Sequence, residues 1–342
     1  MPSGEPFGVP TTAGMTKALF GQNQRVESRG QAVMNEGIAF EAQLEQRQRN
    51  PFRRVWEVFR RWPVIPMVVL SVMAIFAIFA PLISPNDPID QSLRHQYIPP
   101  FWATEQRAEW QPSRARPPEE IGLTQYILGT DNLGRDILSR IIYGARISLM
   151  VALVSLTSGI LVGSTLGLIG GWYGGIVDEL VARLVDIWYA LPFLLVALVV
   201  VIVLGQTLVV MMFVLALTAW SPFVRNVRAE VLSLKERDYV ALARVAGASP
   251  FYIMYKHILP GVINTIVVIA TLNVGGLILA EATLTFLGAG LPSNIPAWGL
   301  MVGEGQLELR IAWWVSFWPG LAIFLTVMSL NFTGDWLRDR LD

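Results

Sequence analysis

The chain contains no cysteine and only two histidines, His95 and His257. Without thiols it has no disulfide, no thiolate metal site and no cysteine nucleophile. The two histidines are far apart in the sequence and neither has a partner at metal-ligand spacing, so we expect no metal site. Its lysines, Lys17, Lys235 and Lys256, do not follow a glycine, so the phosphate-binding loop G-x-x-x-x-G-K-[ST] is absent. We therefore expect a non-catalytic chain without a cofactor.

Charged residues are scarce as well. They make up 15% of the chain, whereas hydrophobic residues make up 53%. About a quarter of the residues of an average soluble domain are charged. This composition indicates an integral membrane protein. Because the formal net charge is zero, the distribution of arginine and lysine along the chain is more informative than their sum.

The first 63 residues contain no long apolar run. Residues 1–45 are rich in polar residues and glycine, which predicts a mobile cytoplasmic tail rather than a signal peptide. Residues 46–63 contain six arginines with aromatic and aliphatic residues between them. This pattern predicts a basic amphipathic segment at the lipid headgroups. Nucleic-acid binding is the rival interpretation of such a run, but an apolar span follows directly, so we expect no nucleic-acid partner.

Residues 64–342 alternate between long apolar runs and short polar segments. The runs predict six transmembrane helices, at about 64–84, 147–170, 176–204, 207–224, 262–288 and 311–334. Six arginines and lysines lie between predicted helices four and five, whereas residues 289–309 contain none. By the positive-inside rule, the basic segment and both chain termini are cytoplasmic. The predicted fold class is an all-α integral membrane protein.

The basic segment between predicted helices four and five has clear helix start and stop signals. Over residues 238–246, apolar residues recur at helical spacing on one face: Tyr239, Leu242, Ala243 and Ala246. Gly247 ends this helix. Ser249 as N-cap and Pro250 at the first helical position then begin a second short helix, which Pro260 follows. Two short helices kinked about a glycine, at about 238–246 and 250–258, predict a protruding knob.

Within this knob, the string DYVALARVAGAS, followed by HILP, resembles the cytoplasmic EAA loop of permease subunits of binding-protein-dependent ABC importers. The resemblance implies a loop that docks into a groove on an ATPase. The residues that carry it are Asp238, Tyr239, Ala241, Leu242, Ala243, Arg244, Gly247, Ala248, Pro250 and Pro260. The motif departs from the family at two positions: Ala241 replaces the usual glutamate, and Leu242 replaces the first alanine.

A second string, LGTDNLGRDILSRIIYGARISL over residues 128–149, resembles the signature of the dipeptide, oligopeptide and nickel branch of this family. Its signature residues are Gly129, Thr130, Asp131, Gly134, Arg135, Asp136, Arg140 and Arg146. We expect a helix on the outer membrane surface, with isoleucines on one face and charged residues on the other. It is either a receptor-facing platform at the pore mouth or a surface helix with internal salt bridges.

Four glycines recur at every fourth residue in predicted helix two: Gly159, Gly163, Gly167 and Gly171. They lie on one helix face. Because helices in lipid associate through close backbone contact, this face predicts a packing seam for another helix, which a partner subunit could supply. A role in substrate binding is the less favoured alternative.

Two acidic residues are candidates for a pathway or gating role, Asp186 and Glu281. Glu179 and Arg183 are spaced i, i+4, and Arg183 and Asp186 i, i+3, so these charges could neutralise one another just before a kink at Pro192. A proton pathway through Asp186 is the alternative to this structural role. Glu281 stands in a predicted membrane helix, where a carboxylate is a functional hypothesis by default, with capping of backbone amides as the other possibility.

The resemblance implies the type I ABC importer permease fold, in a bacterial or archaeal inner membrane. Its implied partners are the lipid bilayer, a second homologous permease, two ATP-binding cassette ATPase subunits and an extracytoplasmic solute-binding protein. The solute would be a peptide or a similar small polar molecule, and ATP hydrolysis would take place on the ATPase partners. Nickel or another non-peptide ligand is the first alternative. A self-sufficient secondary transporter or channel is less favoured, because ionisable residues near mid-membrane are not evident.

The external residues 99–125 form a longer connection than is usual in the family, rich in aromatic and charged residues. They suit a docking surface for the binding protein.

Overall fold

The structure is a computed structural model that describes residues 63–103, 106 and 126–341. The tail over 1–45, nearly all of the basic segment over 46–63 and most of the external segment over 99–125 lie outside the described residues. In the described part of the chain the regular structure is helical, and the one β-type pairing there is an isolated bridge between Thr130 and Asp136. The all-α prediction is confirmed for these residues.

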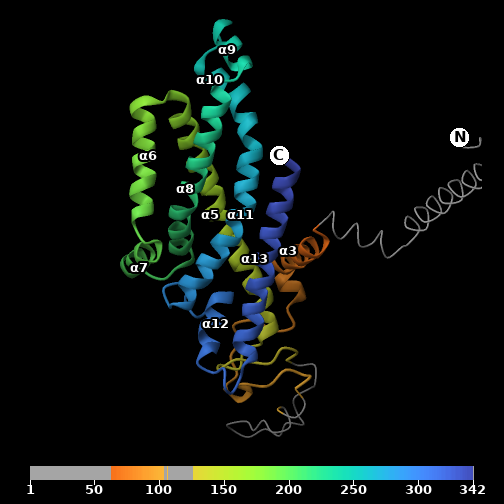
Figure 1. Cartoon of the computed structure of the whole chain (residues 1–342). Helices are drawn as coiled ribbons and strands as arrows, with labels where there is room; N and C mark the ends of the chain where they lie inside the picture. Colours follow the sequence, from red (N-terminus) through yellow and green to blue (C-terminus); the bar gives the residue numbers. More distant parts are fainter. Residues whose placement is uncertain (1–62, 104–105, 107–125, 342) are drawn as a thin grey trace, which may run out of the picture. The chain divides into compact units, whose positions relative to one another are not determined.

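Figure 1 shows the helices in chain order. They are α3 (Val64–Ile83), η1 (Leu93–His95), α5 (Ile137–Tyr173), α6 (Gly175–Ala190), α7 (Phe193–Leu204), α8 (Leu208–Lys235), α9 (Asp238–Val245), α10 (Pro250–Ile253), η3 (Met254–Ile258), α11 (Leu259–Phe286), α12 (Trp298–Gln306) and α13 (Trp314–Leu341). η3 is a π-helical turn that joins α10 to α11 without a break.

Five of the described helical rods are long and apolar enough to cross a membrane: α3, α5, α8, the α10 to α11 rod and α13. The helices α6 and α7 pass the same test as a pair, bent by 82° between them. If the bent pair counts as one span, the described residues form the six spans that the sequence predicts.

The two ends of the helix bundle differ, as Figure 1 shows. At one end, α9 and α10 lie beyond the membrane-length part of α8; we call this the knob end. At the opposite end, the loop end, lie the described residues between α3 and α5 together with α12. The main hydrophobic core includes Phe223 of α8 and extends into the loop end, where it includes Trp298 of α12.

α5 and α8 pack along the glycine face that the sequence predicts. A Cβ on Gly159 would lie 2.6 Å from the Cβ of Ala219, and a Cβ on Gly163 would overlap the backbone of Trp220. Gly167 and Gly171 face the next turns of α8. The seam is therefore confirmed, but its partner is α8 of this chain and not a helix of another subunit. Because the glycines have no Cβ on this face of α5, the backbones of α5 and α8 approach closely.

The predicted start of helix two at 147 was wrong, because α5 begins at Ile137. Its first turns contain the residues that were expected to form a separate surface helix. Arg135, Asp136, Ser139 and Arg140 are buried together with Ile137, so no polar face remains to lie on a membrane surface. The charged side chains interrupt the apolar run in the sequence, but in the fold they pair with acidic groups and the helix continues through them.

The predicted helix three, 176–204, is divided at Pro192 into α6 and α7. Leu191 before the proline is extended, with ψ of 124°, as the steric clash with a proline ring requires. The kink is thus confirmed, and its 82° angle makes the break sharper than a kink within one helix.

Further boundaries differ from the sequence prediction. α8 and α13 continue past their apolar stretches, to Lys235 instead of 224 and to Leu341 instead of 334, and α13 begins at Trp314 instead of 311. Pro260 does not end the second knob helix. The N–H of Leu259 donates to the carbonyl of Met254, a π-helical spacing, and the rod continues through Pro260 into α11.

Candidate functional site

The knob, residues 238–258, contains the helix stop that the sequence predicts. α9 ends at Val245, and Gly247 follows with φ of +80°. The N–H of Gly247 donates to the carbonyl of Arg244 at 3.0 Å, and the N–H of Ala248 donates to that of Ala243 at 3.1 Å. This is the Schellman arrangement, which places a left-handed residue just after a helix. The predicted helix stop at Gly247 is confirmed, and its positive φ suits a residue without a Cβ.

The second knob helix begins where its residues indicate. The Ser249 side chain accepts a hydrogen bond from the Tyr252 N–H at 3.3 Å, and Pro250 occupies the first turn. Because α10, η3 and α11 are continuous, the knob is built directly on the end of a membrane-spanning rod.

The knob attaches to the bundle through Val240, which is buried in a cluster with Ile253 and Ile258 of the following helices and Val231 of α8. The other predicted coupling residues face outward. Exposed are Asp238, Tyr239, Ala241, Leu242, Arg244, Gly247, Pro250 and Pro260, and half-buried are Ala243 and Ala248. The knob thus keeps most of its predicted contact residues available for a partner.

Large apolar side chains add to this outward surface. Leu242 is 69% exposed, Val245 87% and Phe251 75%. Arg244 lies nearer the bundle, with its guanidinium carbon 5.0 Å from the centre of the Trp172 ring.

At the loop end, the signature residues form a buried charge network. The Arg135 side chain donates to Asp131 at 2.7 Å and to Glu304 of α12 at 2.8 Å. Arg140 donates to the same two carboxylates, at 3.0 Å in the case of Glu304. Two guanidinium groups therefore meet two carboxylates, and the network joins α5, the loop before it and α12. Paired in this way, charges can be buried.

Glu304 was not predicted from the sequence, where it lies within residues 289–309, which contain no arginine or lysine. A signal was available: the signature contains two arginines that become buried, and Asp136 is engaged elsewhere, as the N-cap of α5 through the Ser139 N–H at 3.1 Å. Another carboxylate was needed to balance the two arginines. The choice among the remaining acidic residues required the fold.

The rest of the signature shapes the loop around this network. Gly129 and Gly134 have positive φ, and a Cβ on either would overlap backbone of residues 92–98. The Thr130 side chain accepts a hydrogen bond from the Ile98 N–H at 2.8 Å, and its carbonyl accepts one from the Trp314 indole at 3.1 Å. Arg146 is exposed on α5 and does not join the network.

Tyr97 lies beside the same network. Its burial, together with a hydrogen bond to Glu308 and the negative charges of Glu308 and Asp131, raises its pKa to about 12.

Glu281 is buried on α11 between two hydroxyl groups. Ser148 of α5 donates to one of its carboxylate oxygens at 3.0 Å, and Thr285 donates to the other at 2.9 Å. Hydroxyls, rather than the backbone amides expected for a capping role, hold this carboxylate. A role for Glu281 in gating remains a prediction.

Of the two predicted ion pairs, the one between Glu179 and Arg183 is confirmed, at 3.4 Å, whereas Asp186 does not pair with Arg183. The Asp186 carboxylate lies 3.7 Å from the guanidinium of Arg225 on α8. Both pairs are exposed, so the structural role is favoured and a proton pathway through Asp186 stays a prediction.

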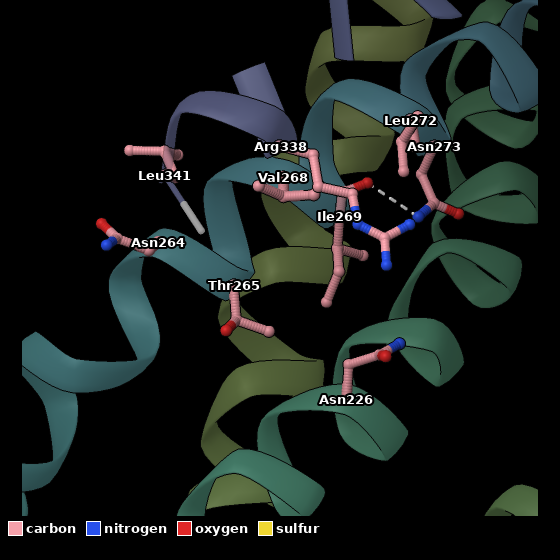
Figure 2. A pocket seen from close by; sticks show the side chains of 9 residues that line it. All are labelled: Asn226, Asn264, Thr265, Val268, Ile269, Leu272, Asn273, Arg338 and Leu341. Atoms are coloured by element: carbon pink, nitrogen blue, oxygen red, sulfur yellow. Dashed lines mark hydrogen bonds between the residues drawn. The ribbon is translucent and has the colours of Figure 1, made fainter. Parts of the chain in front are cut away.

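A polar cavity of about 360 Å³ opens between α8, α11 and α13, and no pattern in the sequence indicated it. Figure 2 shows the residues that line it: Asn226, Asn264, Thr265, Val268, Ile269, Leu272, Asn273, Arg338 and Leu341. The amides and the hydroxyl are uncharged and scattered among apolar residues, so hydropathy does not distinguish them from the rest of the span.

Comparison with known proteins assigns the chain. A family model described as the binding-protein-dependent transport system inner membrane component matches residues 159–342, more than half of the sequence. The chain belongs to this family. A second model, described as the N-terminal TM domain of oligopeptide transport permease C, matches residues 50–100. The resemblance drawn from the knob and the signature is confirmed: the chain is a multi-pass permease subunit of an ABC importer in the inner membrane.

The permease is similar over most of its length to curated permeases. It is 37% identical to the dipeptide transport system permease protein DppC of Haemophilus influenzae, covering 86% of this chain and 95% of that protein. It is 36% identical to the di/tripeptide permease DppC of Pseudomonas aeruginosa, covering 86% and 92%. It is 42% identical to the glutathione permease GsiD of Pectobacterium atrosepticum, covering 63% and 71%.

A solved structure of the MetNI methionine ABC transporter in inward-facing conformations also matches the permease. The match covers 60% of this chain and 98% of that chain, at 21% identity and a TM-score of 0.49.

Proposed function

We propose that this permease subunit imports short peptides, as one half of a membrane pathway whose other half is a second, related permease subunit. Each of the three relatives described above is named for a peptide: a dipeptide, a di- or tripeptide, and glutathione. The match of residues 50–100 to an oligopeptide permease domain supports the same solute class. Nickel is the alternative cargo, and no relative described above is named for it.

The observation that carries the coupling part of this proposal is the exposed apolar surface of the knob. A short helix that leaves Leu242 and Val245 exposed, on a part that protrudes beyond the membrane-length helices, suits a groove on another protein. We propose that the groove belongs to an ATPase subunit, so that the transporter contains two such ATPases, one for each permease.

The distribution of basic residues supports an orientation with the knob end in the cytoplasm, together with both chain termini. The loop end then faces the outside, where an extracytoplasmic binding protein delivers the peptide. The signature network and the external residues 99–125 are the proposed contact region for that protein.

The rod formed by α10, η3 and α11 provides a mechanical route between these two ends. It spans Pro250–Phe286, so it is about 55 Å long at about 1.5 Å per residue. At its loop end, Ala282 packs so closely on α12 that a Cβ on Gly299 would overlap its backbone. ATP-driven closure of the ATPases would move the knob as a rigid body, and the rod would carry that displacement to α12 and the signature network.

The test of this function is uptake by the purified complete transporter in liposomes, with ATP inside and the binding protein outside. We expect accumulation of a radiolabelled dipeptide, competed by other short peptides but not by free amino acids. ATP-dependent accumulation of Ni²⁺ without dipeptide uptake would overturn the peptide assignment.

A further inference from the structure

The cavity in Figure 2 is lined by polar side chains from three membrane-length helices. Asn226 comes from α8, Arg338 from α13, and Asn264, Thr265 and Asn273 from α11. On α11 the polar residues and their apolar neighbours recur at intervals of four, so three successive turns present one face to the cavity. Polar side chains in membrane helices are costly and usually mark a pathway or a partner. The cavity therefore has the polarity of a binding site and not of a lipid contact.

Two of the amides are held in a defined orientation by their own helices. The side chain of Asn226 donates one N–H to the carbonyl of Pro222 at 2.8 Å, and Asn273 donates one to the carbonyl of Ile269 at 2.8 Å. A carboxamide has two N–H donors and one carbonyl acceptor. This bond uses only one N–H of each amide. The second N–H and the carbonyl oxygen do not take part in it, and both residues line the cavity.

The lining has a positive charge and no negative charge. Arg338 is the single charged residue among the nine that line the cavity, and none of the nine is acidic. Figure 2 shows the Arg338 guanidinium extending into the space that these residues surround. Such a lining does not suit a metal cation, because it has a positive charge and contains no carboxylate, imidazole or thiolate ligand. A guanidinium, with five N–H donors, suits a carboxylate.

A short peptide with a free C-terminus combines the groups that this lining complements. Its main chain alternates N–H and C=O groups that can pair with the amides, and its terminal carboxylate can accept from the guanidinium. A volume of about 360 Å³ lies at the lower end of the roughly 300 to 1,000 Å³ typical of small-molecule sites. The four apolar lining residues, Val268, Ile269, Leu272 and Leu341, can contact peptide side chains of varied shape.

We propose that this cavity holds the peptide in transit, by its main-chain amides and its C-terminal carboxylate, with Arg338 as the carboxylate-binding residue. The inference rests on the proposed function, since it assigns a binding site for the peptide within the permease. It predicts that recognition here depends on the free carboxylate and little on the identity of the side chains.

The absence of cysteine from this subunit permits a direct test. In the assembled transporter, with any partner cysteines removed, Val268→Cys places a thiol in the cavity, and Ile263→Cys places one on an exposed part of the same helix, outside the lining. The probe is bromoacetyl-alanylalanine, whose bromide a thiol displaces, compared with its C-terminal amide. During ATP turnover we expect the acid to label the Val268→Cys variant more than the amide does, and unlabelled dialanine to protect it. The Ile263→Cys variant should be neither protected nor selective.

Arg338→Gln in the Val268→Cys background tests the carboxylate contact. Labelling by the acid should fall by about tenfold, to the level of the amide, as expected when a charge-assisted hydrogen bond is lost. Arg340→Gln, on the same helix but outside the lining, should leave the preference for the acid unchanged. Equal labelling by acid and amide in the parent background would overturn the role of Arg338.

Uptake of radiolabelled dialanine in the same liposomes distinguishes a failure of the cavity assignment from a failure of the peptide-importer assignment. If dialanine is imported while Val268→Cys is neither labelled nor protected, the cavity assignment is overturned and the peptide importer stands. If dialanine is not imported by the unmodified complex, both are overturned.

Discussion

The guanidinium of Arg140, in the first turn of α5, donates a 3.0 Å hydrogen bond to the carboxylate of Glu304 on α12. The two residues are 164 positions apart in the sequence. Both ends of this bond belong to the charge network that also contains Asp131 and Arg135. The bond therefore makes the packing of the permease at its loop end depend on balanced charge.

Removing the Glu304 charge should destabilise the permease. In Glu304→Gln, two buried guanidinium groups would share the single carboxylate of Asp131, and breaking a buried pair costs on the order of 3 kcal/mol. We expect a clearly lower midpoint of thermal unfolding in detergent. Glu179→Gln breaks an ion pair that is exposed on both sides, so it should have almost no effect. Equal midpoints for the two variants would contradict a structural role for the network.

The glycine seam should not tolerate a methyl group. In Gly163→Ala the new Cβ would overlap the backbone of Trp220, so α5 and α8 must separate, at a cost of about 1 to 3 kcal/mol. In Gly276→Ala the Cβ meets no atom within 4 Å, so that variant should be neutral or slightly stabilised. Thermal unfolding in detergent measures both. A Gly163→Ala protein as stable as Gly276→Ala would refute the close packing.

Gly247 provides a test of coupling, because its constraint is conformational and not steric. A Cβ there meets nothing within 4 Å, but φ is +80°. A β-branched residue in this region costs roughly 1 to 2 kcal/mol. Gly247→Val should therefore insert and assemble normally but lose peptide-stimulated ATP hydrolysis and uptake, since the angle between the knob helices changes.

The matched control is Gly247→Asn, because asparagine tolerates the left-handed region. It should keep most of the ATP hydrolysis and uptake of the unmodified transporter. Full coupling in the valine variant would remove Gly247 from the mechanism.

The orientation and the ATPase contact can be tested together with single cysteines. Ala241 is exposed on the knob, and the preceding Val240 is buried. Ala241→Cys should crosslink to the ATPase subunit and react with an impermeant maleimide only from the cytoplasmic side. Val240→Cys should react from neither side. Labelling of Ala241→Cys from outside the cell would reverse the proposed topology.

Alkaline pH should weaken the contact of Tyr97 with Glu308. Because the folded-state pKa of Tyr97 is raised from 10.0 to about 12, its contribution to stability is fully present below pH 10 and is lost as the pH rises towards 12. Tyr97→Phe cannot ionise, so the stability difference between the two proteins should change over this range. A difference that stays constant between pH 9 and pH 12, in chemical unfolding, would contradict the contact.

Local patterns in the sequence were sufficient for the membrane class, the spans and the knob. The length of each apolar run is set by the thickness of the membrane. Gly247, Ser249 and Pro250 affect only the backbone within a few residues of their own positions. For the same reason the kink at Pro192 was predictable. The glycine face of α5 also predicted a close helix contact, since four glycines at helical spacing leave a smooth surface whatever the partner is.

Contacts between distant segments had to be decided by the tertiary structure. Arg140 precedes the uncharged run and so suggested that the membrane helix begins only after it, yet Glu304 and Asp131 neutralise Arg140 and α5 begins already at Ile137. The glycine face could have met any helix, and only the fold selects α8. The polar cavity combines residues of α8, α11 and α13 whose amides and hydroxyl have no charge or period to reveal them. Helical periodicity and hydropathy are properties of neighbours along the chain, whereas charge compensation and cavities depend on which helices meet in space.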